Sequence, residues 1–346
     1  MIFIPPFPFE TVKLPKKRRK KVLIKREKPL AMRKKMLYNR TYRAYKKNSA
    51  IGKLFDFDKM HKEAIRVKKY TIGLYEKAMP SRMSWGEKLA FARECGYDFV
   101  EISIDETEEK LSRLDWSGAE RLELVRTMRE AGLPIRTMCL SGHRKFPLGS
   151  SDPAVCARGM EIMEKAIVLA DDLGIRIIQL AGYDVYYEES TAQTKARFLA
   201  NLKKAVEMAA VRGILLGFET METDFMNTVW KSMFYVNAVG SPYLGVYPDS
   251  GNLTNASLPG GVSVAEDLSS GRGHLVALHL KETVPGVFRE VPFLTGHVDF
   301  PAVIERAWSL GVRRYVTEMW YTGNDDWAEA VRFARKSMGD LLDRQA

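Results

Sequence analysis

The stretch Leu173-Gly174-Ile175-Arg176-Ile177-Ile178 joins the expected end of a helix to the start of an apolar, β-branched run. Glycine accepts the left-handed backbone conformation that ends a helix, so this stretch predicts a helix-to-strand junction. The same pattern recurs along the chain, with glycine at positions 96, 132, 174, 213 and 311. Five such junctions indicate a domain in which helices and strands alternate.

Eight β-rich runs can be counted outward from this junction. They are Thr71–Tyr75, Phe99–Ile104, Ile135–Leu140, Ile175–Ala181, Ile214–Glu219, Leu244–Asp249, Leu275–His279 and Tyr315–Met319. Most are separated by enough residues for a helix, and Asp152-Pro153 marks the start of one such helix. Mostly apolar strands are buried on both faces, as in a parallel sheet.

Eight strand-helix units in about 275 residues predict an α/β fold of the (β/α)8 barrel type. The active site of such a barrel lies at the C-terminal ends of its strands. A doubly wound open sheet is the alternative, but no GxGxxG sequence follows the first run to support it.

The charge of the chain divides it into two parts. Residues 1–69 hold 23 of the 54 lysines and arginines but only 5 of the 43 acidic residues, so residues 70–346 are net acidic. We interpret 1–69 as a basic, mostly disordered extension and 70–346 as the barrel domain. The extension could attract nucleic acid or a membrane surface, or it could be dispensable and precede a true start near Met36 or Met60.

Three unevenly spaced cysteines make a disulfide framework or a cysteine metal site unlikely and favour a reducing, cytoplasmic compartment. No apolar run approaches the roughly 20 residues that span a bilayer, so no membrane-spanning segment is expected.

Four ionisable residues stand at the ends of the last four runs. They are Glu219, Asp249, His279 and Glu318, and the first three are 30 residues apart, the length of one strand plus one helix. Oxygen ligands with one imidazole suit a divalent ion such as Zn, Mn, Mg or Co. Any one of these residues alone could instead cap a helix or be a core histidine, but consecutive barrel strands would bring all four together.

Glu219 and Glu318 could also serve as a pair of bases. If they face each other across the rim, one could remove a proton from a substrate carbon and the other could return it on the opposite face. The metal would meanwhile stabilise the negative charge beside a polarised carbonyl. Inversion at a carbon next to a ketone is the expected outcome.

The third run leads into Ser141-Gly-His-Arg-Lys-Phe-Pro-Leu-Gly-Ser150. Ser141, His143, Arg144 and Lys145 in this loop predict a phosphate seat, with a solvated surface loop as the alternative. Further candidate pocket residues are Tyr75 with Glu76-Lys77, the segment Glu101 to Glu106, Asn252, Lys281, and Trp320 with Tyr321. Asp105 could equally cap a helix, and Trp320 could equally belong to the core.

Several longer motifs make a family resemblance recognisable. They are Leu74-Tyr-Glu-Lys-Ala78, the 140–150 loop, Gln179-Leu-Ala-Gly-Tyr-Asp-Val-Tyr-Tyr187, Tyr247-Pro-Asp-Ser-Gly-Asn252, His279-Leu-Lys-Glu-Thr-Val-Pro-Gly-Val-Phe288 and Thr317-Glu-Met-Trp320. From about Tyr70 onward the chain resembles the L-ribulose-5-phosphate 3-epimerases of bacterial L-ascorbate and pentose catabolism, also called L-xylulose-5-phosphate 3-epimerases. The resemblance does not extend to residues 1–69.

For residues 70–346, this resemblance implies a xylose-isomerase-like TIM barrel that acts as a homodimer on a phosphorylated ketopentose. It implies a metal held by Glu219, Asp249, His279 and Glu318, with the two glutamates as the acid–base pair. Related epimerases of free ketoses carry an arginine about six residues after the metal histidine, where this chain has Pro285. Two alternatives remain: an epimerase or isomerase of unphosphorylated ketoses, and a metal-dependent endonuclease on a similar barrel.

Overall fold

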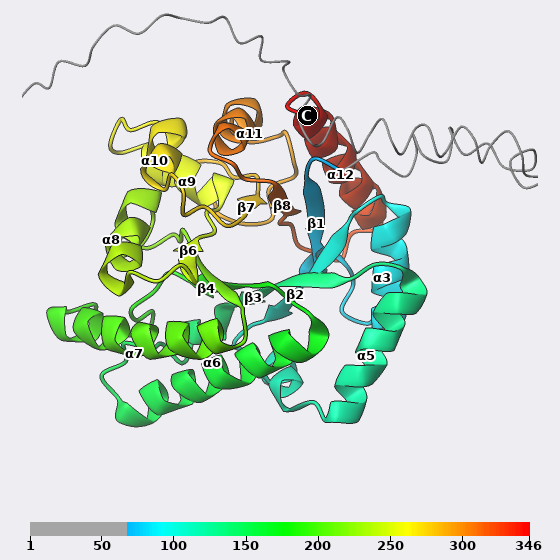
Figure 1. The fold of residues 1–346 in the computed structure, drawn as a ribbon. Coiled ribbons are helices and arrows are strands. Elements are labelled where there is room, and N and C mark those ends of the chain that lie inside the picture. Colours follow the sequence, from blue (N-terminus) through cyan, green and yellow to red (C-terminus); the bar gives the residue numbers. More distant parts are fainter. Residues whose placement is uncertain (1–67) are drawn as a thin grey trace, which may run out of the picture. The chain divides into compact units, whose positions relative to one another are not determined.

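Eight parallel strands form the centre of the protein in a computed structural model that describes residues 68–346 (Figure 1). The strands are β1 (Thr71–Tyr75), β2 (Phe99–Ile104), β3 (Ile135–Leu140), β4 (Ile177–Ala181), β5 (Leu215–Glu219), β6 (Leu244–Val246), β7 (Leu278–Leu280) and β8 (Arg314–Thr317). The predicted basic extension lies outside the described residues, except for Lys68 and Lys69.

The strands pair in the order β6-β5-β4-β3-β2-β1-β8-β7, and every pair is parallel. The two ends of this order are joined by parallel bridges between Val246 and Leu275 and between Asp249 and His279. Backbone bonds from Val276 N–H to Val246 and from His279 N–H to Pro248 complete this seam. The sheet therefore closes into the predicted (β/α)8 barrel.

Helices surround the barrel on its outer side (Figure 1). The longer ones are α3 (Trp85–Glu94), α5 (Gly118–Ala131), α6 (Pro153–Leu173), α7 (Ala192–Val211), α8 (Val229–Val239), α11 (Phe300–Ser309) and α12 (Trp327–Asp343). Shorter helical segments are η2 (Glu76–Ala78), α4 (Glu108–Leu111), η3 (Ser112–Asp115), η4 (Ser141–Arg144), α9 (Ser250–Ser257) and α10 (Val264–Ser270). Among residues 68–346, none of these helices has the length and apolar character needed to cross a membrane.

The five predicted junction glycines all have a positive φ, between 63° and 94°. Gly174, for example, ends α6 at φ 73°, and its N–H reaches back to the carbonyls of Ala170 and Asp171. At the other end of α6, the Asp152 side chain accepts a hydrogen bond from the N–H of Ala154, and Pro153 occupies the first turn. The sequence rules for ending and starting a helix therefore hold here.

Strand bounds agree with the prediction at β1, β2 and β3, and the later strands are shorter than predicted. The predicted run to Asp249 ends at Val246, because Pro248 has no N–H to continue the ladder. Asp249 is instead the N-cap of α9, where its Oδ1 accepts a hydrogen bond from the N–H of Asn252 at 2.7 Å. The predicted run Leu275–His279 begins as a strand only at Leu278.

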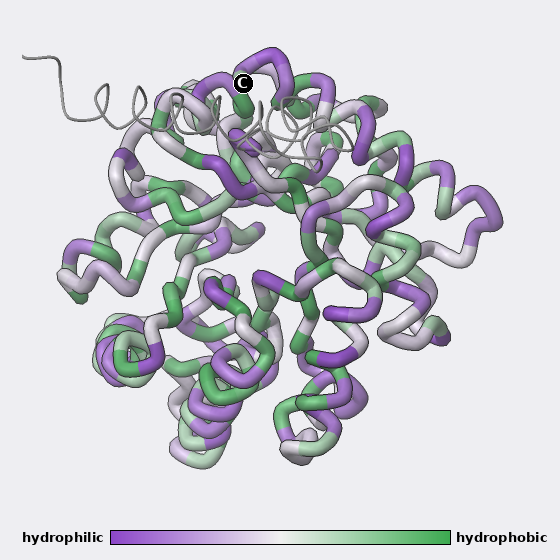
Figure 2. Tube along the Cα trace, turned by 45° about the vertical axis from the view of Figure 1, so that its right-hand side comes forward, coloured by the Kyte–Doolittle hydropathy of each residue, from purple (hydrophilic) through white to green (hydrophobic). Residues whose placement is uncertain are grey.

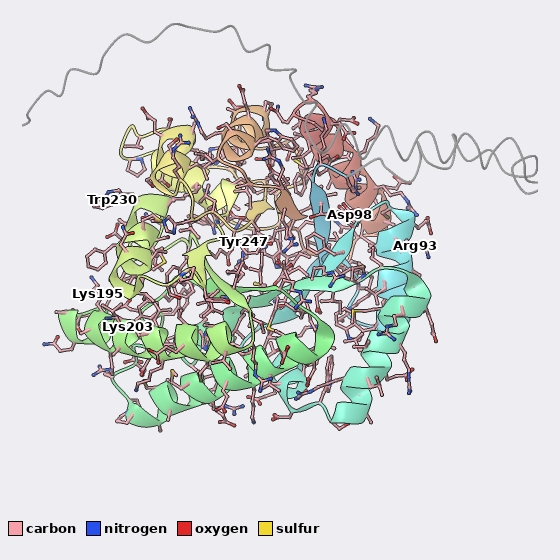
Figure 3. All side chains as sticks on the ribbon, viewed as in Figure 1. Arg93, Asp98, Lys195, Lys203, Trp230 and Tyr247 are labelled. Atoms are coloured by element: carbon pink, nitrogen blue, oxygen red, sulfur yellow. The ribbon has the colours of Figure 1, made fainter. Side chains whose placement is uncertain are left out.

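The barrel interior has its own small core, separate from the larger layer between strands and helices. Tyr75, Phe99, Cys139, Ile177, Tyr247, Ala277 and Val316 form this interior cluster. Tyr247 lies inside the barrel, whereas Trp230 on α8 lies at the outer edge (Figure 3). Hydrophobic and hydrophilic residues alternate along the outer helices, as expected for helices with one face against the sheet (Figure 2). The interior cluster forms the floor beneath the C-terminal rim.

Candidate active site

The four predicted ligands meet at the C-terminal rim of the barrel. Glu219 ends β5, Asp249 begins α9, His279 lies within β7 and Glu318 follows β8 directly. One ligand atom from each lies within 4.8 Å of the others, and all four residues are buried. Consecutive strands thus bring the quartet together as the sequence spacing predicted.

One nitrogen of His279 faces the three carboxylates. Its Nδ1 is 2.9 Å from Glu318 Oε2, 3.9 Å from Glu219 Oε1 and 4.0 Å from Asp249 Oδ2. Atoms that each bind one ion at about 2.1 Å are separated from one another by roughly 3 to 4 Å. The spacing around Nδ1 therefore fits a single divalent ion.

Asp249 supplies a second sign that the donors fit a cation. Its Oδ1 accepts a hydrogen bond from the Asn252 N–H, whereas its Oδ2 is buried and has no hydrogen-bond partner within residues 68–346. A buried carboxylate oxygen without a partner is costly, and a metal ion would satisfy it. The sequence left open whether Asp249 caps a helix or binds a metal. Its two oxygens allow both roles, because Oδ1 caps α9 and Oδ2 faces His279 and the other carboxylates.

Lys281 and Asn252 support the quartet from one side. The Lys281 Nζ lies 3.0 Å from Asp249 Oδ1, 2.9 Å from Asn252 Oδ1 and 3.6 Å from Glu318 Oε2. Asn252 in turn donates to the carbonyl of Thr220 at 2.7 Å. Both residues line the pocket, as predicted for substrate contacts, but in this structure their polar groups hold the ligand residues in place.

The carboxyl groups of the quartet have unequal electrostatic surroundings. Burial and the nearby charge of Glu318 raise the pKa of Glu219 to about 8, and burial raises the pKa of Asp249 to about 6. Burial would also raise the pKa of Glu318, but Lys281 and His279 outweigh it and hold that pKa below its usual value. Two carboxyl groups with different proton affinities in one pocket are the arrangement that acid–base chemistry needs.

The imidazole of His279 is held from below by a carboxylate that belongs to β2. Glu101 Oε1 lies 2.6 Å from His279 Nε2, and Glu101 Oε2 accepts a hydrogen bond from the Tyr247 hydroxyl at 3.0 Å. The amide nitrogen of Gln179 is 3.2 Å from both ring nitrogens. From the sequence, Glu101 was predicted only as a possible pocket residue, and Gln179 was not predicted as a site residue.

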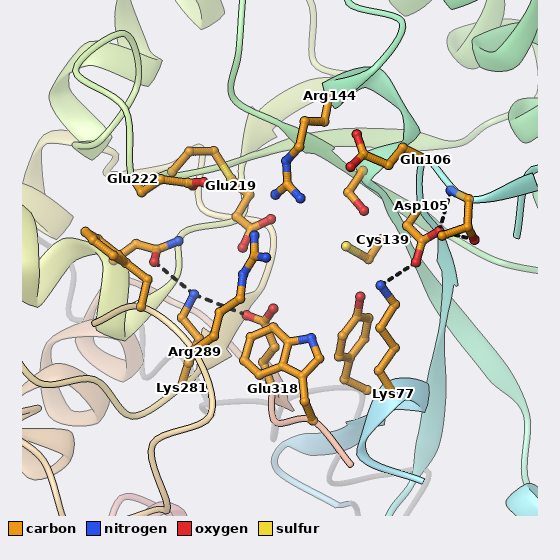
Figure 4. Close-up of a pocket in the computed structure, with 17 residues that line it drawn as sticks. Lys77, Asp105, Glu106, Cys139, Arg144, Glu219, Glu222, Lys281, Arg289 and Glu318 are labelled. Carbon is orange, nitrogen blue, oxygen red and sulfur yellow. Dashed lines mark hydrogen bonds and ion pairs between the residues drawn. The ribbon is translucent and has the colours of Figure 1, made fainter. Parts of the chain in front are cut away.

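A cavity of about 200 Å³ opens beside Glu219 and Glu318 of the quartet (Figure 4). Glu219 and Glu318 both line it, together with the predicted Tyr75, Ser141, Asn252, Lys281 and Trp320. The Tyr75 hydroxyl shares a hydrogen bond with Ser103 Oγ, and its ring meets Trp320 edge to face at 6.2 Å. Trp320 therefore lines the pocket and also packs against the barrel interior, so it has both of the roles considered for it, pocket wall and core residue.

The basic loop after β3 contributes only part of its predicted set. Arg144 and Ser141 line the cavity, whereas His143 and Lys145 do not. These residues lie in or next to the turn η4, in which neighbouring side chains point in different directions. Lys145 is half exposed and pairs with Glu108 at 3.6 Å, while His143 is buried against the carbonyl of Gly159 at 3.1 Å.

We expect His143 to make the fold sensitive to acid. Burial lowers the pKa of His143 to about 4, below its usual value of 6.5. Between these values the unfolded chain binds a proton that the folded chain does not, so stability is lost as the pH falls from 6.5 towards 4. At pH 4.5 the loss should reach about 2 to 3 kcal/mol relative to pH 7.5.

Urea unfolding of the wild type and of His143→Gln at several pH values measures this effect. The glutamine retains an N–H donor for Gly159 but has no titrating group, so the difference in stability between the two proteins should shrink as the pH falls. A constant difference from pH 7.5 to pH 4.5 would rule out this role for His143.

Arg144 is well placed to meet an anion. Its guanidinium lies 5.0 Å from the ring centre of Tyr186 and 5.8 Å from that of Tyr183. The Tyr183 hydroxyl donates to Glu222, which also lines the cavity, at 2.7 Å. Arg144 Nε is buried and has no hydrogen-bond partner among the described residues. The aromatic rings support the guanidinium in the cavity wall, where an anion in the cavity can contact it.

The loop between β7 and α11 brings a second arginine to the cavity. Arg289 lines it, with its guanidinium 6.0 Å from the Trp320 ring centre. The loop is anchored by Glu282, a buried carboxylate that accepts hydrogen bonds from the N–H groups of Thr283, Leu294 and Val298. Pro285 lies in this same loop, and Arg289 follows it by four residues.

Lys77 is the fourth cation in the cavity wall, after Lys281, Arg144 and Arg289, and it pairs with Asp105 at 2.5 Å (Figure 4). The Asp105 carboxylate also accepts hydrogen bonds from the N–H and hydroxyl of Thr107. Thr107, and not Asp105, is the N-cap of α4, so Asp105 lines the pocket without capping the helix. Sequence reasoning did not find Glu222, Phe288 or Arg289. They lie in long connections without a periodic pattern, and no local signal distinguishes them.

Comparisons with known proteins agree with this geometry. Residues 89–337 match the family described as xylose isomerase-like TIM barrel. The L-ribulose-5-phosphate 3-epimerase UlaE of Escherichia coli O157:H7 is 47% identical over 269 residues, which cover 78% of this chain and 93% of the relative. The corresponding protein of Shigella sonnei is 48% identical over 267 residues, covering 77% and 93% of the two chains.

Solved structures of similar fold have much lower identity. A D-psicose 3-epimerase in the presence of D-fructose superposes with a TM-score of 0.65 at 18% identity, covering 79% of this chain and 99% of the other. An L-ribulose 3-epimerase superposes with a TM-score of 0.64 at 20% identity, covering 80% and 95%. At this identity the structures support the barrel fold, and the family assignment depends on the sequence relatives. The chain belongs to the L-ribulose-5-phosphate 3-epimerase family, within the xylose isomerase-like TIM barrels.

Proposed function

We propose that this protein interconverts L-ribulose 5-phosphate and L-xylulose 5-phosphate by inverting C3. The observation that carries the proposal is the joint presence of two buried carboxylates and a cation-lined cavity in a chain 47% identical to L-ribulose-5-phosphate 3-epimerases. The family resemblance also supports a role in bacterial L-ascorbate and pentose catabolism.

In this proposal the quartet of Glu219, Asp249, His279 and Glu318 holds a divalent metal ion. The carboxylate oxygens and single imidazole suit Zn, Mn, Mg or Co, and the buried, unpartnered Asp249 Oδ2 supports the fit. The chemistry that a bound divalent ion supplies is electrostatic, because it polarises the carbonyl at C2 and stabilises negative charge that develops beside C3.

Glu219 and Glu318 carry the proton in both directions. One glutamate, as the carboxylate, removes the C3 proton and becomes protonated; the other, in its carboxylic acid form, delivers a proton to the opposite face of the same carbon and becomes a carboxylate. Both groups line one cavity, and Lys281 beside Glu318 favours the ionised form of that carboxylate. Trp320 and Tyr75 enclose the reacting region and limit access of water.

The direct test is conversion of L-ribulose 5-phosphate in deuterated water. We expect L-xylulose 5-phosphate to form with deuterium at C3, because the proton returned should come from the second carboxylate after exchange with solvent. Formation of another product, or inversion at a different carbon, would contradict the proposal. Inversion without deuterium would count against two-base transfer unless the proton is shielded and returned internally.

We propose Arg144 as a main contact of the substrate phosphate, with Arg289 and Lys77 beside it. A charge-assisted hydrogen bond contributes about 1.5 to 3 kcal/mol. Arg144→Ala should therefore reduce kcat/KM for L-ribulose 5-phosphate about 10- to 100-fold, mainly through KM, and should change activity on unphosphorylated L-ribulose much less.

Lys145→Ala is the matched control for this experiment. It removes the neighbouring cation from the same loop, but Lys145 pairs with Glu108 and does not line the cavity. Equal losses on the phosphorylated and free sugar in Arg144→Ala would place the phosphate elsewhere.

We also propose a cytoplasmic homodimer. Its support on the surface is a group of exposed apolar side chains around α8 and the segment from α9 to α10, namely Trp230, Phe234, Leu258 and Val262, which are 54 to 70% exposed. Trp230, seen at the edge of the molecule in Figure 3, also borders an apolar hollow with Leu253 and Val262. Sedimentation equilibrium should show a dimer that Trp230→Glu dissociates; an unchanged mass would place the interface elsewhere.

A further inference from the structure

We propose that Glu101 is a positioning residue that selects the metal-binding nitrogen of His279. The inference depends on the proposed function, because it takes the quartet as a metal site. Glu101 lies on β2, a strand that contributes none of the four proposed metal ligands. Glu101 acts through His279 and does not line the cavity itself.

The position of Glu101 requires an explanation. Its side chain is fully buried inside the barrel, at the level where Phe99, Ile177 and Ala277 form an apolar cluster. A carboxylate in such a place is strongly destabilising unless charged or hydrogen-bonded partners satisfy it. Its partners are His279, which lies three strands away around the barrel order, and Tyr247.

The contacts of Glu101 determine which ring nitrogen carries a proton. Glu101 Oε1 is 2.6 Å from Nε2 of His279, and its Oε2 already accepts from the Tyr247 hydroxyl. A carboxylate only accepts hydrogen bonds, so Nε2 must carry the proton and donate it. In a neutral imidazole this leaves the lone pair on Nδ1, the nitrogen that faces Glu219, Asp249 and Glu318.

Glu318 Oε2 lies 2.9 Å from Nδ1, but Glu318 is itself a proposed metal ligand, so a metal ion held between Glu318 and Nδ1 would leave Glu101 as the carboxylate that accepts the ring proton. The remaining described neighbours of the ring do not distinguish its nitrogens. The Gln179 amide nitrogen is equally far from both ring nitrogens, at 3.2 Å, so it cannot favour one of them. Tyr75 and Tyr247 contact the ring through their own rings, with centroids at 6.3 and 4.9 Å, and restrict its tilt without distinguishing its nitrogens. A metal-bound histidine commonly donates its other N–H to a carboxylate, and the loss of that partner weakens metal binding about 10- to 100-fold.

Metal affinity measured by chelator competition with Zn²⁺ tests the inference without relying on activity. We expect Glu101→Gln to bind Zn²⁺ about 10- to 100-fold more weakly than the wild type, because an amide can present an N–H to Nε2 and so favour the wrong tautomer. Tyr247→Phe keeps the carboxylate on the ring and should lose less, up to about tenfold. Weak Zn²⁺ binding by the wild type itself would instead refute the proposed metal site.

Glu76→Gln is the matched control. Glu76 is another fully buried carboxylate, at the end of the neighbouring strand β1, and it pairs with Lys110 and Arg113 without touching His279. Its loss should lower the melting temperature and leave Zn²⁺ affinity unchanged. Glu101→Gln affinity within about threefold of wild type, or an equal loss in Glu76→Gln, would overturn the assignment to Glu101.

The tautomer can be read directly in the wild type, which keeps the inference testable even if no Glu101 variant folds. The chain has five histidines, so long-range proton–nitrogen spectra of the Zn²⁺-loaded protein should be resolvable, with His279 assigned by its loss in His279→Asn. We expect the proton on Nε2 and the metal on Nδ1. The reverse pattern would overturn the inference.

Discussion

Replacing either Glu219 or Glu318 by glutamine should reduce kcat for C3 inversion at least about 1,000-fold. A well-placed acid or base contributes about 10²- to 10⁴-fold to a proton transfer, and each of these residues is also a proposed metal ligand. Glutamine keeps the size of the side chain and removes its ability to carry the proton. Because the two residues act in one sequence of events, the double variant should be little worse than either single variant.

Exchange of the C3 proton with deuterated water separates the roles of the two glutamates. Each epimer presents its C3 proton to one face, so each single variant, reloaded with metal, should keep slow exchange with one epimer and lose it with the other. Opposite epimers should be affected in Glu219→Gln and Glu318→Gln.

Asp249→Asn provides the comparison for loss of a ligand without loss of a base. Asp249 contacts Lys281 and Asn252 and is not proposed to transfer protons. Its variant should lose bound metal and should lose exchange with both epimers together. If the two glutamate variants show this same pattern with full metal content, the two-base assignment fails.

Removal of the metal should abolish turnover and also weaken the fold. Electrostatic stabilisation by a metal ion is worth several kcal/mol in the transition state, which corresponds to a rate loss of about 1,000-fold or more. A ligand present at about 1,000 times its Kd stabilises the folded protein by about 4 kcal/mol. Dialysis against a chelator should therefore reduce activity and the melting temperature together.

Titration with Mn²⁺, Co²⁺, Zn²⁺ and Mg²⁺ then shows which ions restore both properties. His279→Asn should show neither the loss on chelation nor the recovery, because it lacks a ligand of the quartet. Full activity of a chelated protein with less than one metal ion per hundred chains would contradict the metal-assisted mechanism.

The sequence predicted the parts of the site that follow from regular structure. Barrel strands repeat at about 30 residues and end at one rim, so the spacing of Glu219, Asp249 and His279 was enough to bring them together. The junction glycines were equally predictable, because a positive φ is a property of one residue and its immediate neighbours. Both features depend on local geometry that repeats.

Other parts depend on tertiary contacts that no local pattern encodes. Three basic residues follow one another from His143 to Lys145, but only Arg144 reaches the cavity, because the turn directs each side chain differently. Arg289 lies in a loop where Glu290 and Leu294 adopt positive φ, a conformation that could not be predicted because neither residue is glycine. Glu101 could have been recognised from the sequence, because a carboxylate within an otherwise apolar strand indicates a buried hydrogen-bonding partner.

The seam between β6 and β7 has a consequence for how the barrel opens. Only isolated bridges and a few backbone bonds join these strands, and Asp249 and His279 lie opposite each other across it. An ion bound by both residues would hold together the two neighbouring strands that share the fewest backbone hydrogen bonds. Amide hydrogens of Val246, Val276 and His279 should then exchange with solvent through local opening when the ion leaves, before the rest of the sheet is affected.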